Sequence, residues 1–252
     1  MTVKRILPLF LLLALTSLAA GAQTVDEILE KHAAAHGGVE KWRAVKSMVV
    51  TGTQVMFSEP SPFVYEWRRP DSSRFEQSML GQKVTYVHDG SNTWWIHPLL
   101  IGEQPAVVPA EAAAAVRRAT DFESPLVDAK AKGHKVELLG KDEVDGQPAL
   151  KLKVTRKDGT EETWYLDPST WLELARFDRT IDLPEIKDRW TWFSDFRTVD
   201  GLVIPHQQEQ EYSIRNVSVR VEKVQINPEI DPGRFTMPVV EKKAEGEGKQ
   251  GE

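Results

Sequence analysis

From residue 48 onward, side-chain character changes with a period of two residues, the period at which a β-strand presents its two faces. In one such segment, Phe63, Tyr65 and Trp67 share a face and the residues between them share the other. Turn signals, of which Asp145-Gly146 and Asp158-Gly159 are the strongest, separate the segments. The pattern predicts roughly ten short antiparallel strands in one barrel-like sheet. It excludes the doubly wound nucleotide-binding folds, which alternate strands with helices.

Two or three helices are expected beside these strands. Thr24 and Glu27 form a capping box in front of apolar residues at helical spacing, and the glycines at 37–38 end that helix because glycine tolerates a left-handed conformation. A short second helix is expected over residues 39–45. Proline at 109 suits the first turn of a third, alanine-rich helix that we expect to run to about residue 122.

Composition limits the class of protein. The chain has 252 residues, of which 40% are hydrophobic, and a formal net charge of −6, so one globular domain is expected. The acidic balance argues against nucleic-acid binding, which is usually carried by a basic patch. Because the chain contains no cysteine, disulfides, thiolate metal sites, thiol nucleophiles and lipid attachment at a cysteine are excluded.

Both ends of the chain differ from the middle. Lys4 and Arg5 precede a short apolar run, and Ala20-Gly21-Ala22 resembles a signal-peptidase cleavage site. The apolar run is shorter than the about 20 residues that span a bilayer. We therefore expect residues 1–22 to be a cleaved signal peptide, residues 23–240 to be the domain, and the charged, glycine-rich residues 241–252 to be disordered. The mature protein should be soluble and lie outside the cytoplasm.

The sequence lacks the common catalytic motifs. It contains no G-x-S-x-G nucleophile elbow, no H-E-x-x-H zinc motif, no Walker loop and no EF-hand loop. A G-x-G-x-x-G string at 246–251 lies in the polar tail with no strand before it, so it is not a pyrophosphate site. Paired carboxylates such as Glu161-Glu162 are interpreted as solvated strand edges. We expect no enzymatic activity.

His32 and His36 are the strongest metal candidates, because residues four apart lie on one face of a helix. Two ligands do not complete the four of a typical zinc site, however, and neither histidine has a carboxylate partner nearby in the sequence. Their position in the last turns of the helix also suits the helix dipole. The sequence therefore favours a structural role, and we expect neither a metal nor a cofactor.

Most of the tryptophans fall on predicted strands or their turns. Aromatic strand faces are compatible with a core filled by large side chains and with a concave face that binds an apolar ligand. The residues alone leave both interpretations open.

Four stretches together resemble the LolA-like family of periplasmic lipoprotein carriers. The segment 67–70 (Trp-Arg-Arg-Pro), followed by Phe75, is similar to that family's arginine-proline segment. The segment 87–98 resembles its strand, Asp-Gly turn, tryptophan strand and proline, 165–174 its strand–turn–strand midsection, and 234–238 (Arg-Phe-Thr-Met-Pro) its closing motif. The resemblance covers about residues 45–238.

The resemblance implies a mainly β (α+β) fold: an open, unclosed antiparallel β-barrel, or half-barrel, capped by helices and with an apolar interior for acyl chains. By position, Arg69 corresponds to the family's arginine that locks the lid and releases cargo. The region 105–122 would supply the lid. A strand-end arginine paired with a carboxylate is the alternative interpretation of Arg69.

The expected function is therefore that of a soluble, monomeric periplasmic carrier of lipid or lipoprotein acyl chains. Its partners would include an inner-membrane donor and an outer-membrane acceptor protein. The alternative is a non-enzymatic envelope sensor or partner-binding module of the same fold. The side chains expected to contact the ligand are Met48, Val50, Phe63, Tyr65, Trp67, Arg69, Phe75, Trp94, Ile96, Val116, Trp190 and Trp192.

Overall fold

The computed structural model describes residues 23–239 except positions 57, 183–184 and 213–214. The predicted signal peptide (1–22) and the predicted disordered tail (241–252) lie outside the described residues. The elements, in chain order, are α1 (Val25–Ala35), α2 (Val39–Ala44), β1 (Ser47–Met56), β2 (Glu59–Arg68), β3 (Ser72–Met79), β4 (Gln82–Asp89), β5 (Thr93–His97), β6 (Gly102–Val107), α3 (Ala110–Arg118), β7 (Lys135–Val144), β8 (Gln147–Thr155), β9 (Glu161–Leu166), β10 (Glu173–Asp182), β11 (Glu185–Val199), β12 (Leu202–Tyr212), β13 (Arg215–Ile226) and the 3-10 turn η1 (Pro232–Phe235).

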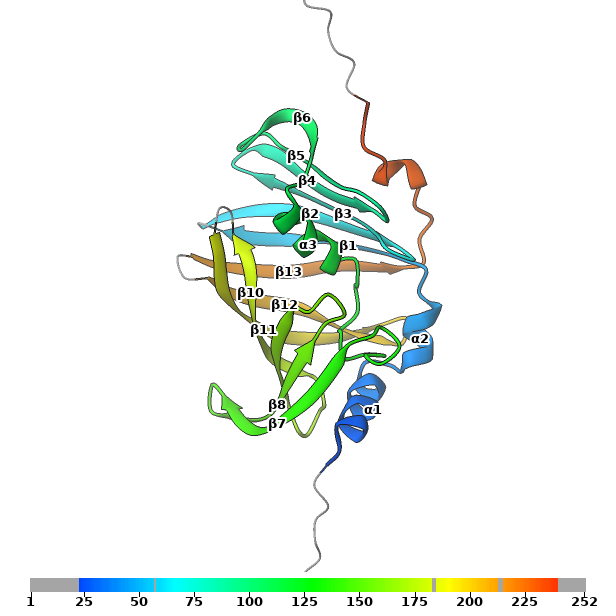
Figure 1. The fold of residues 1–252 in the computed structure, drawn as a ribbon, viewed down its shortest axis with the longest axis vertical. Coiled ribbons are helices and arrows are strands. Elements are labelled where there is room, and N and C mark those ends of the chain that lie inside the picture. The colour runs from blue at the N-terminus through cyan, green and yellow to red at the C-terminus, as the bar shows by residue number, and fades with distance from the viewer. Residues whose placement is uncertain (1–22, 57, 183–184, 213–214, 240–252) are drawn as a thin grey trace, which may run out of the picture.

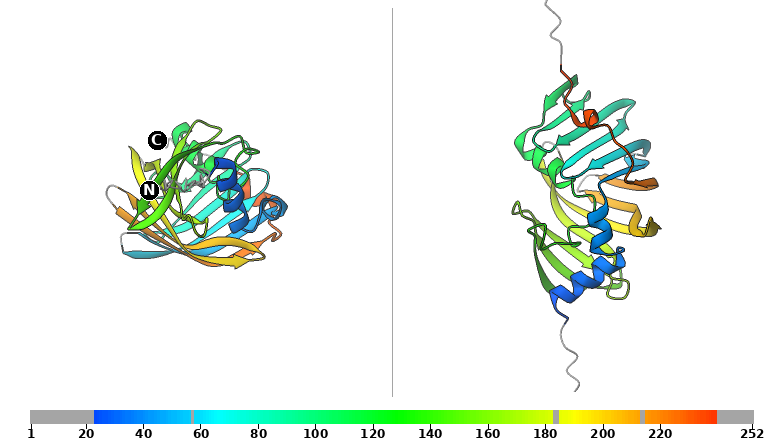
Figure 2. Two further views of the ribbon diagram at one scale, coloured as in Figure 1. Left: turned by 90° about the horizontal axis from the view of Figure 1, so that it is seen from below. Right: turned by 90° about the vertical axis from the view of Figure 1, so that its right-hand side faces the viewer.

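The strands form one 13-stranded antiparallel sheet in the order β6-β5-β4-β3-β2-β1-β13-β12-β11-β10-β9-β8-β7. Neighbours in the sheet are neighbours in the chain, except that β1 pairs with β13 and joins the two halves. β6 and β7 are the two edges, so the sheet is open, and it curves strongly (Figures 1 and 2). The predicted α+β fold with an open, unclosed antiparallel half-barrel and helices is confirmed.

The strand inventory differs from the prediction in two places. β6 was not predicted, because its proline at 105 is unusual in a strand; an edge strand tolerates it, since one side of the strand needs no ladder hydrogen bonds. The predicted strands at 202–208 and 211–214 are one continuous strand, β12, as far as residue 212.

The helix starts and stops follow local chemistry. The predicted capping box is present: the Thr24 amide donates to Glu27 Oε2 (3.0 Å) and the Glu27 amide donates to Thr24 Oγ1 (3.2 Å). The third helix ends at Arg118 instead of continuing to residue 122. The Thr120 hydroxyl donates to the Arg117 carbonyl (2.8 Å) and so satisfies one of the carbonyls that a further turn would use.

Helices and η1 cover different faces of the sheet. Successive residues of a strand point to opposite faces, and α3 packs against Trp95 whereas the η1 segment packs against Trp94. α3 therefore lies on the concave face and η1 on the convex face (Figure 1). Ile28 of α1 packs against the inner side chains of β8 and β9, among them Leu152. Within the described ranges, no helix has the length and apolar character needed to cross a membrane.

Candidate ligand-binding site

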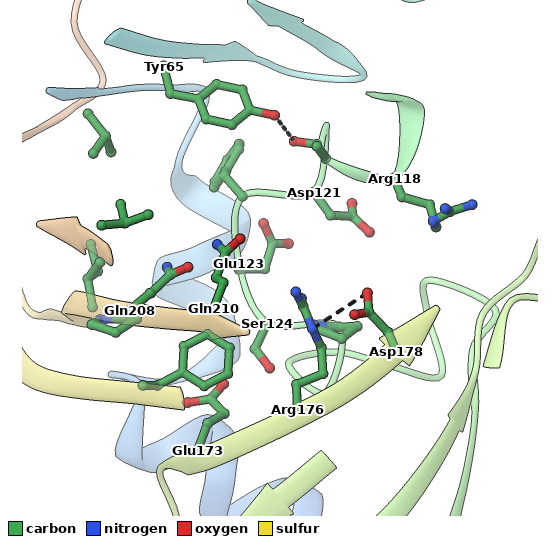
Figure 3. Close-up of a pocket in the computed structure, with 18 of the residues that line it drawn as sticks. Tyr65, Arg118, Asp121, Glu123, Ser124, Glu173, Arg176, Asp178, Gln208 and Gln210 are labelled. Atoms are coloured by element: carbon green, nitrogen blue, oxygen red, sulfur yellow. Dashed lines mark hydrogen bonds and ion pairs between the residues drawn. The ribbon is translucent and has the colours of Figure 1, made fainter. Parts of the chain in front are cut away.

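A cavity of about 480 Å³ lies between the concave face of the sheet and the segment 119–125 that follows α3 (Figure 3). The strands β1–β3 supply mainly aromatic and aliphatic side chains to it, and β9–β12 supply charged and amide side chains together with Trp164 and Phe193. The residues that line it are His36, Trp42, Val50, Gln54, Phe63, Tyr65, Trp67, Phe75, Ala115, Arg118, Ala119, Asp121, Phe122, Glu123, Ser124, Pro125, Arg156, Glu162, Trp164, Glu173, Arg176, Asp178, Thr180, Arg189, Phe193, Val203, Ile204, Pro205, Gln208, Gln210, Val219 and Val221.

β1, β2 and β3 build the apolar side. Val50 lies opposite Tyr65 and Tyr65 lies opposite Phe75 in the strand register, so the three side chains share the concave face. The rings of Tyr65 and Trp67 stack with their centroids 3.8 Å apart. Burial raises the pKa of Tyr65, so its phenol is neutral. This side presents a continuous aromatic surface to a ligand.

β10 and β11 contribute a salt bridge to the opposite side. Arg189 makes two hydrogen bonds to Asp178, at 2.6 and 2.9 Å. Burial alone would raise the pKa of Asp178, but Arg176 and Arg189 outweigh it and hold the pKa below its ordinary value. Asp178 is therefore ionised at neutral pH.

Arg176 is an incompletely satisfied charge in the cavity: its Nη2 donates to Thr191 Oγ1 at 3.4 Å. Its Nε is buried and has no hydrogen-bond partner in the part of the chain that the structure describes; the Asp178 carboxylate is 3.8 Å from it. Gln208 and Gln210 of β12, two strands away from Arg176 in the sheet, line the same side of the cavity (Figure 3). This side can therefore donate hydrogen bonds to a polar or anionic group. An apolar interior was predicted; the structure has one apolar side and one ionic side.

The segment 119–125 is fastened over the cavity from the aromatic strand β2. Trp67 Nε1 donates to the Ala119 carbonyl (2.7 Å), and the Tyr65 hydroxyl donates to the same oxygen (3.3 Å). Further along, the Glu123 carboxylate accepts from Arg69 Nη2 at 3.0 Å and forms an ion pair with Lys132 Nζ at 3.0 Å. We call residues 119–125 the cover segment.

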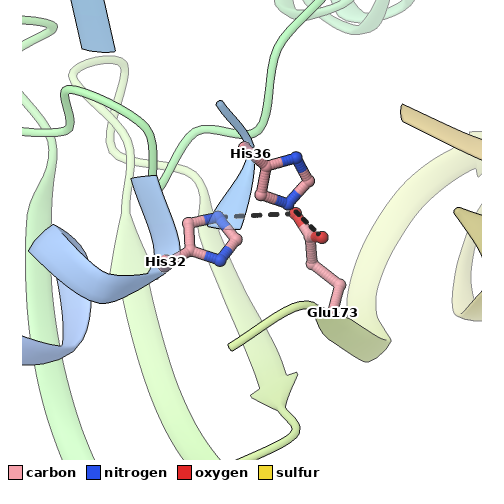
Figure 4. A group of neighbouring side chains, drawn as sticks. All are labelled: His32, His36 and Glu173. Carbon is pink, nitrogen blue, oxygen red and sulfur yellow. Dashed lines mark hydrogen bonds and ion pairs between the residues drawn. The ribbon is translucent and has the colours of Figure 1, made fainter. Parts of the chain in front are cut away.

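His32, His36 and Glu173 form a second, buried group (Figure 4). His36 Nε2 lies 2.8 Å and His32 Nε2 3.5 Å from the carboxylate oxygens of Glu173. Burial lowers the pKa of His32. For His36, the attraction and hydrogen bond of Glu173 outweigh burial and raise the pKa. The two imidazoles likewise outweigh burial at Glu173 and lower its pKa to about 2.

Five of the residues predicted to contact a ligand line the cavity: Val50, Phe63, Tyr65, Trp67 and Phe75. The others lie elsewhere. Met48 is in the core with Trp42, Arg69 holds the cover segment, and Val116 is on α3 without lining the cavity. Trp94 and Ile96 pack with η1 on the convex face, and Trp190 and Trp192 pack with Tyr165 and Ala175.

Sequence reasoning missed the ionic side of the cavity and Glu173. On β11, Arg189 and Phe193 face the cavity and alternate with Trp190 and Trp192, and the sequence prediction placed those two tryptophans inside. The two-residue alternation of side-chain types can be seen in the sequence. Which of the two alternating sets of side chains faces the cavity depends on pairs formed between strands, such as Asp178 of β10 with Arg189 of β11.

No family model matches the chain, and no curated protein matches it. Solved structures do match in fold. A putative outer membrane lipoprotein-sorting protein domain from Vibrio parahaemolyticus superposes with a TM-score of 0.56 at 10% identity, covering 84% of this chain and 97% of the other. A DUF1329 family protein from Desulfovibrio piger superposes with a TM-score of 0.57 at 11% identity, covering 85% of this chain and 98% of the other.

A LolA superfamily protein from Nitrosomonas europaea gives a TM-score of 0.55 at 12% identity, with 85% of this chain and 98% of the other covered. At these identities the likeness concerns the fold. The open antiparallel sheet agrees with that likeness, and so do the sequence segments that resembled the family. The chain therefore has the LolA-like fold.

Proposed function

We propose that this protein binds the acyl chains of lipids or lipoproteins in the cavity and acts as a soluble periplasmic carrier, without catalysing a reaction on its cargo. The observation that carries the proposal is the cavity of about 480 Å³ with an aromatic wall formed by β1–β3. Its volume falls in the range of about 300–1,000 Å³ that is usual for small-molecule pockets.

The two sides of the cavity suggest how such a ligand lies. Burying a hydrocarbon chain against Phe63, Tyr65 and Phe75 removes apolar surface from water and so favours binding. A carboxylate or phosphate group can instead accept hydrogen bonds from Arg176 and from the amides of Gln208 and Gln210. The proposed cargo is therefore an amphiphile with its chain on the β1–β3 side and its polar end on the β10–β12 side.

The affinity expected for such a ligand suits a carrier. Burying about ten methylenes contributes about 8 kcal/mol, which corresponds to a dissociation constant on the order of 1 μM before ordering costs are subtracted. A carrier must release its cargo, so an open half-barrel that buries part of a chain is better suited to transport than a closed barrel that buries all of it.

The cover segment offers a route for release. Arg69 is the residue that the family resemblance assigns to the lid, and here it holds Glu123 at 3.0 Å. In the proposed cycle, breaking this ion pair frees the cover segment and exposes the aromatic wall to the membrane or to an acceptor protein.

A fluorescent fatty acid tests the proposal directly. Titration of the mature protein with cis-parinaric acid should show saturable binding at about micromolar concentration. Phe75→Ala removes a ring from the cavity wall and should weaken binding about fivefold to tenfold, because such a contact contributes about 1 kcal/mol. Ile96→Ala is the matched control, since Ile96 is also half-buried but packs on the convex face.

Two results would contradict the proposal. One is a folded protein that binds neither cis-parinaric acid nor lipid extracted from envelope membranes. The other is an equal loss of binding in Phe75→Ala and Ile96→Ala, because binding would then not occur at the aromatic wall. The first result would favour the alternative, a sensor or partner-binding module.

A further inference from the structure

Three buried side chains that could each offer a metal ligand atom meet at the end of α1. His32 lies in the last turn of α1, His36 directly follows the helix, and Glu173 begins β10. One ligand atom from each residue lies within 4.8 Å of the other two. All three residues are less than 5% exposed. A charged carboxylate is rarely buried without a partner of opposite charge or a metal ion.

Backbone carbonyls fix which imidazole nitrogen of each histidine faces the carboxylate. His32 Nδ1 lies 2.8 Å from the Trp171 carbonyl, and His36 Nδ1 lies 2.8 Å from the Val203 carbonyl. A carbonyl oxygen only accepts hydrogen bonds, so both Nδ1 atoms carry a proton and donate it. Both Nε2 atoms therefore point toward Glu173. Histidine ligands of metals usually have this arrangement, in which the distal N–H is held by a carbonyl or carboxylate.

The distances are compatible with a metal ion and also with hydrogen bonds, in which His32 Nε2 accepts from Ser124 Oγ at 3.2 Å. A hydrogen bond joins His36 Nε2 to Glu173 at 2.8 Å, but His32 Nε2 is 3.5 Å from the other carboxylate oxygen, which is too long for a hydrogen bond. In a tetrahedral zinc site with bonds of about 2.0 Å, neighbouring ligand atoms are about 3.3 Å apart. The His32–Glu173 distance is already close to this value, and the His36–Glu173 distance needs to open by about 0.5 Å.

The cluster of His32, His36 and Glu173 borders the cavity. His36 and Glu173 line it, as does Ser124 of the cover segment, whose Oγ lies 3.2 Å from His32 Nε2. An ion bound by the three side chains would thus have protein on one side and the cavity on the other. A water molecule or an oxygen of a bound ligand would complete the coordination, as in zinc sites that have three protein ligands.

We propose that His32, His36 and Glu173 form a binding site for one divalent transition-metal ion of the zinc type, with a coordination position directed into the cavity. Two imidazoles and one carboxylate suit zinc and its neighbours in the first transition row, and they suit calcium or magnesium poorly because those ions prefer oxygen ligands. The proposal departs from the sequence-based expectation of no metal, which rested on two histidines being too few for a zinc site, on the lack of a carboxylate nearby in the sequence and on the fit of the histidines to the helix dipole.

Metal titration of the mature, untagged protein tests the site, and no lipid is added. After metal is stripped with a chelator, isothermal titration with Zn²⁺ should show one ion bound per chain, and Zn²⁺ should raise the unfolding temperature. Co²⁺ should give the visible absorption bands of a four- or five-coordinate ion with nitrogen and oxygen ligands. Acyl-chain binding is not measured, so failure here leaves the proposed function intact, and the reverse also holds.

Variants assign the ion to these residues. His32→Gln and Glu173→Gln should each weaken Zn²⁺ binding by at least about tenfold and abolish the Co²⁺ bands. His88→Gln is the matched control, because His88 is equally buried but lies on β4 and hydrogen-bonds to Thr93; it should bind Zn²⁺ like the wild type.

Three outcomes would overturn the proposal. The wild type could bind no stoichiometric Zn²⁺ or Co²⁺ while folded. Both folded variants could bind as tightly as the wild type. His88→Gln could lose binding that Glu173→Gln retains. If a variant does not fold, the stoichiometry and Co²⁺ spectrum of the wild type decide the question by themselves.

Discussion

Arg69 and Glu123 form an ion pair that joins the end of β2 to the cover segment, with Nη2 and Oε1 3.0 Å apart. The Glu123 side chain is almost fully buried, whereas that of Arg69 is 31% exposed. Arg69 also lies over the ring of Phe122 and donates from Nε to the Val45 carbonyl at 2.9 Å. One side chain thereby connects the sheet, the α2 corner and the cover segment.

Arg69→Leu should loosen the cover segment more than it destabilises the sheet. Glu123 would keep only Lys132 as a counter-charge, so we expect the free energy of unfolding to fall by about 1–2 kcal/mol, less than for a fully buried pair because Arg69 is partly in solvent. Hydrogen exchange of residues 119–125 should speed up. The neighbouring, exposed Arg68→Leu is the control; similar exchange in both variants would contradict the role of Arg69.

Trp67→Phe tests the other anchor of the cover segment. The change removes the indole N–H that donates to the Ala119 carbonyl at 2.7 Å and keeps an aromatic ring in the cavity wall. Loss of this bond should cost about 1 kcal/mol in urea unfolding and speed up amide exchange near residue 119. Tyr65→Phe removes a longer bond of 3.3 Å to the same oxygen and should cost less. The reverse order would mean that Trp67 acts only through packing.

Local chemistry allowed much of the fold to be predicted. The capping box at Thr24 and the glycine turn at 37–38 depend on residues within four positions of one another, and both are present. The strand alternation at 63–67 also placed its aromatic residues together, and they line the cavity. These features need no knowledge of distant parts of the chain.

For other strands, the sequence could not show which side chains face the concave side of the sheet. Trp94 and Trp95 are adjacent, so one must point to each face, and the periodicity does not decide which. Trp95 packs beneath α3, and Trp94 packs beneath Phe235. The choice depends on two segments that lie after β5 in the chain, one of them 141 residues after Trp94.

Glu173 shows most clearly what the sequence alone does not reveal. Its partner His36 is 137 residues away, and nothing near either residue indicates the pairing. The contact exists because the α1–α2 corner docks on the turn between β11 and β12 and on the start of β12, where the Val203 amide donates to the His36 carbonyl at 3.3 Å. A metal or ion-pair role for the histidines therefore becomes visible only after tertiary structure forms.

The two glycines at that corner give a matched pair of substitutions. Gly37 and Gly38 have φ angles of +99° and +98°, so alanine is strained at both. A Cβ on Gly37 would lie 2.2 Å from the Gly201 carbonyl oxygen, whereas a Cβ on Gly38 meets nothing within 4 Å. Gly38→Ala should cost about 1–2 kcal/mol of unfolding free energy, and Gly37→Ala clearly more. Equal costs would show that the corner does not press against residue 201.

Acid should weaken the protein through Asp178. The native pKa of this carboxyl is held below its ordinary value of 3.8 because Arg176 and Arg189 outweigh the effect of burial. The unfolded chain therefore binds a proton at a higher pH than the native chain does. The stability that Asp178 contributes is complete above its ordinary pKa and is lost as the pH falls through the lower native pKa.

Asp178→Asn should remove that part of the pH dependence. At pH 7 the variant leaves Arg189 and Arg176 without their shared carboxylate, so we expect a loss of about 3 kcal/mol in urea unfolding. Between pH 4 and pH 2.5 the wild type should lose stability faster than the variant, so the two curves converge, because only the wild type has this carboxyl to protonate. Parallel curves across that range would mean that the native pKa of Asp178 is not depressed and that the Arg189 contact is solvated.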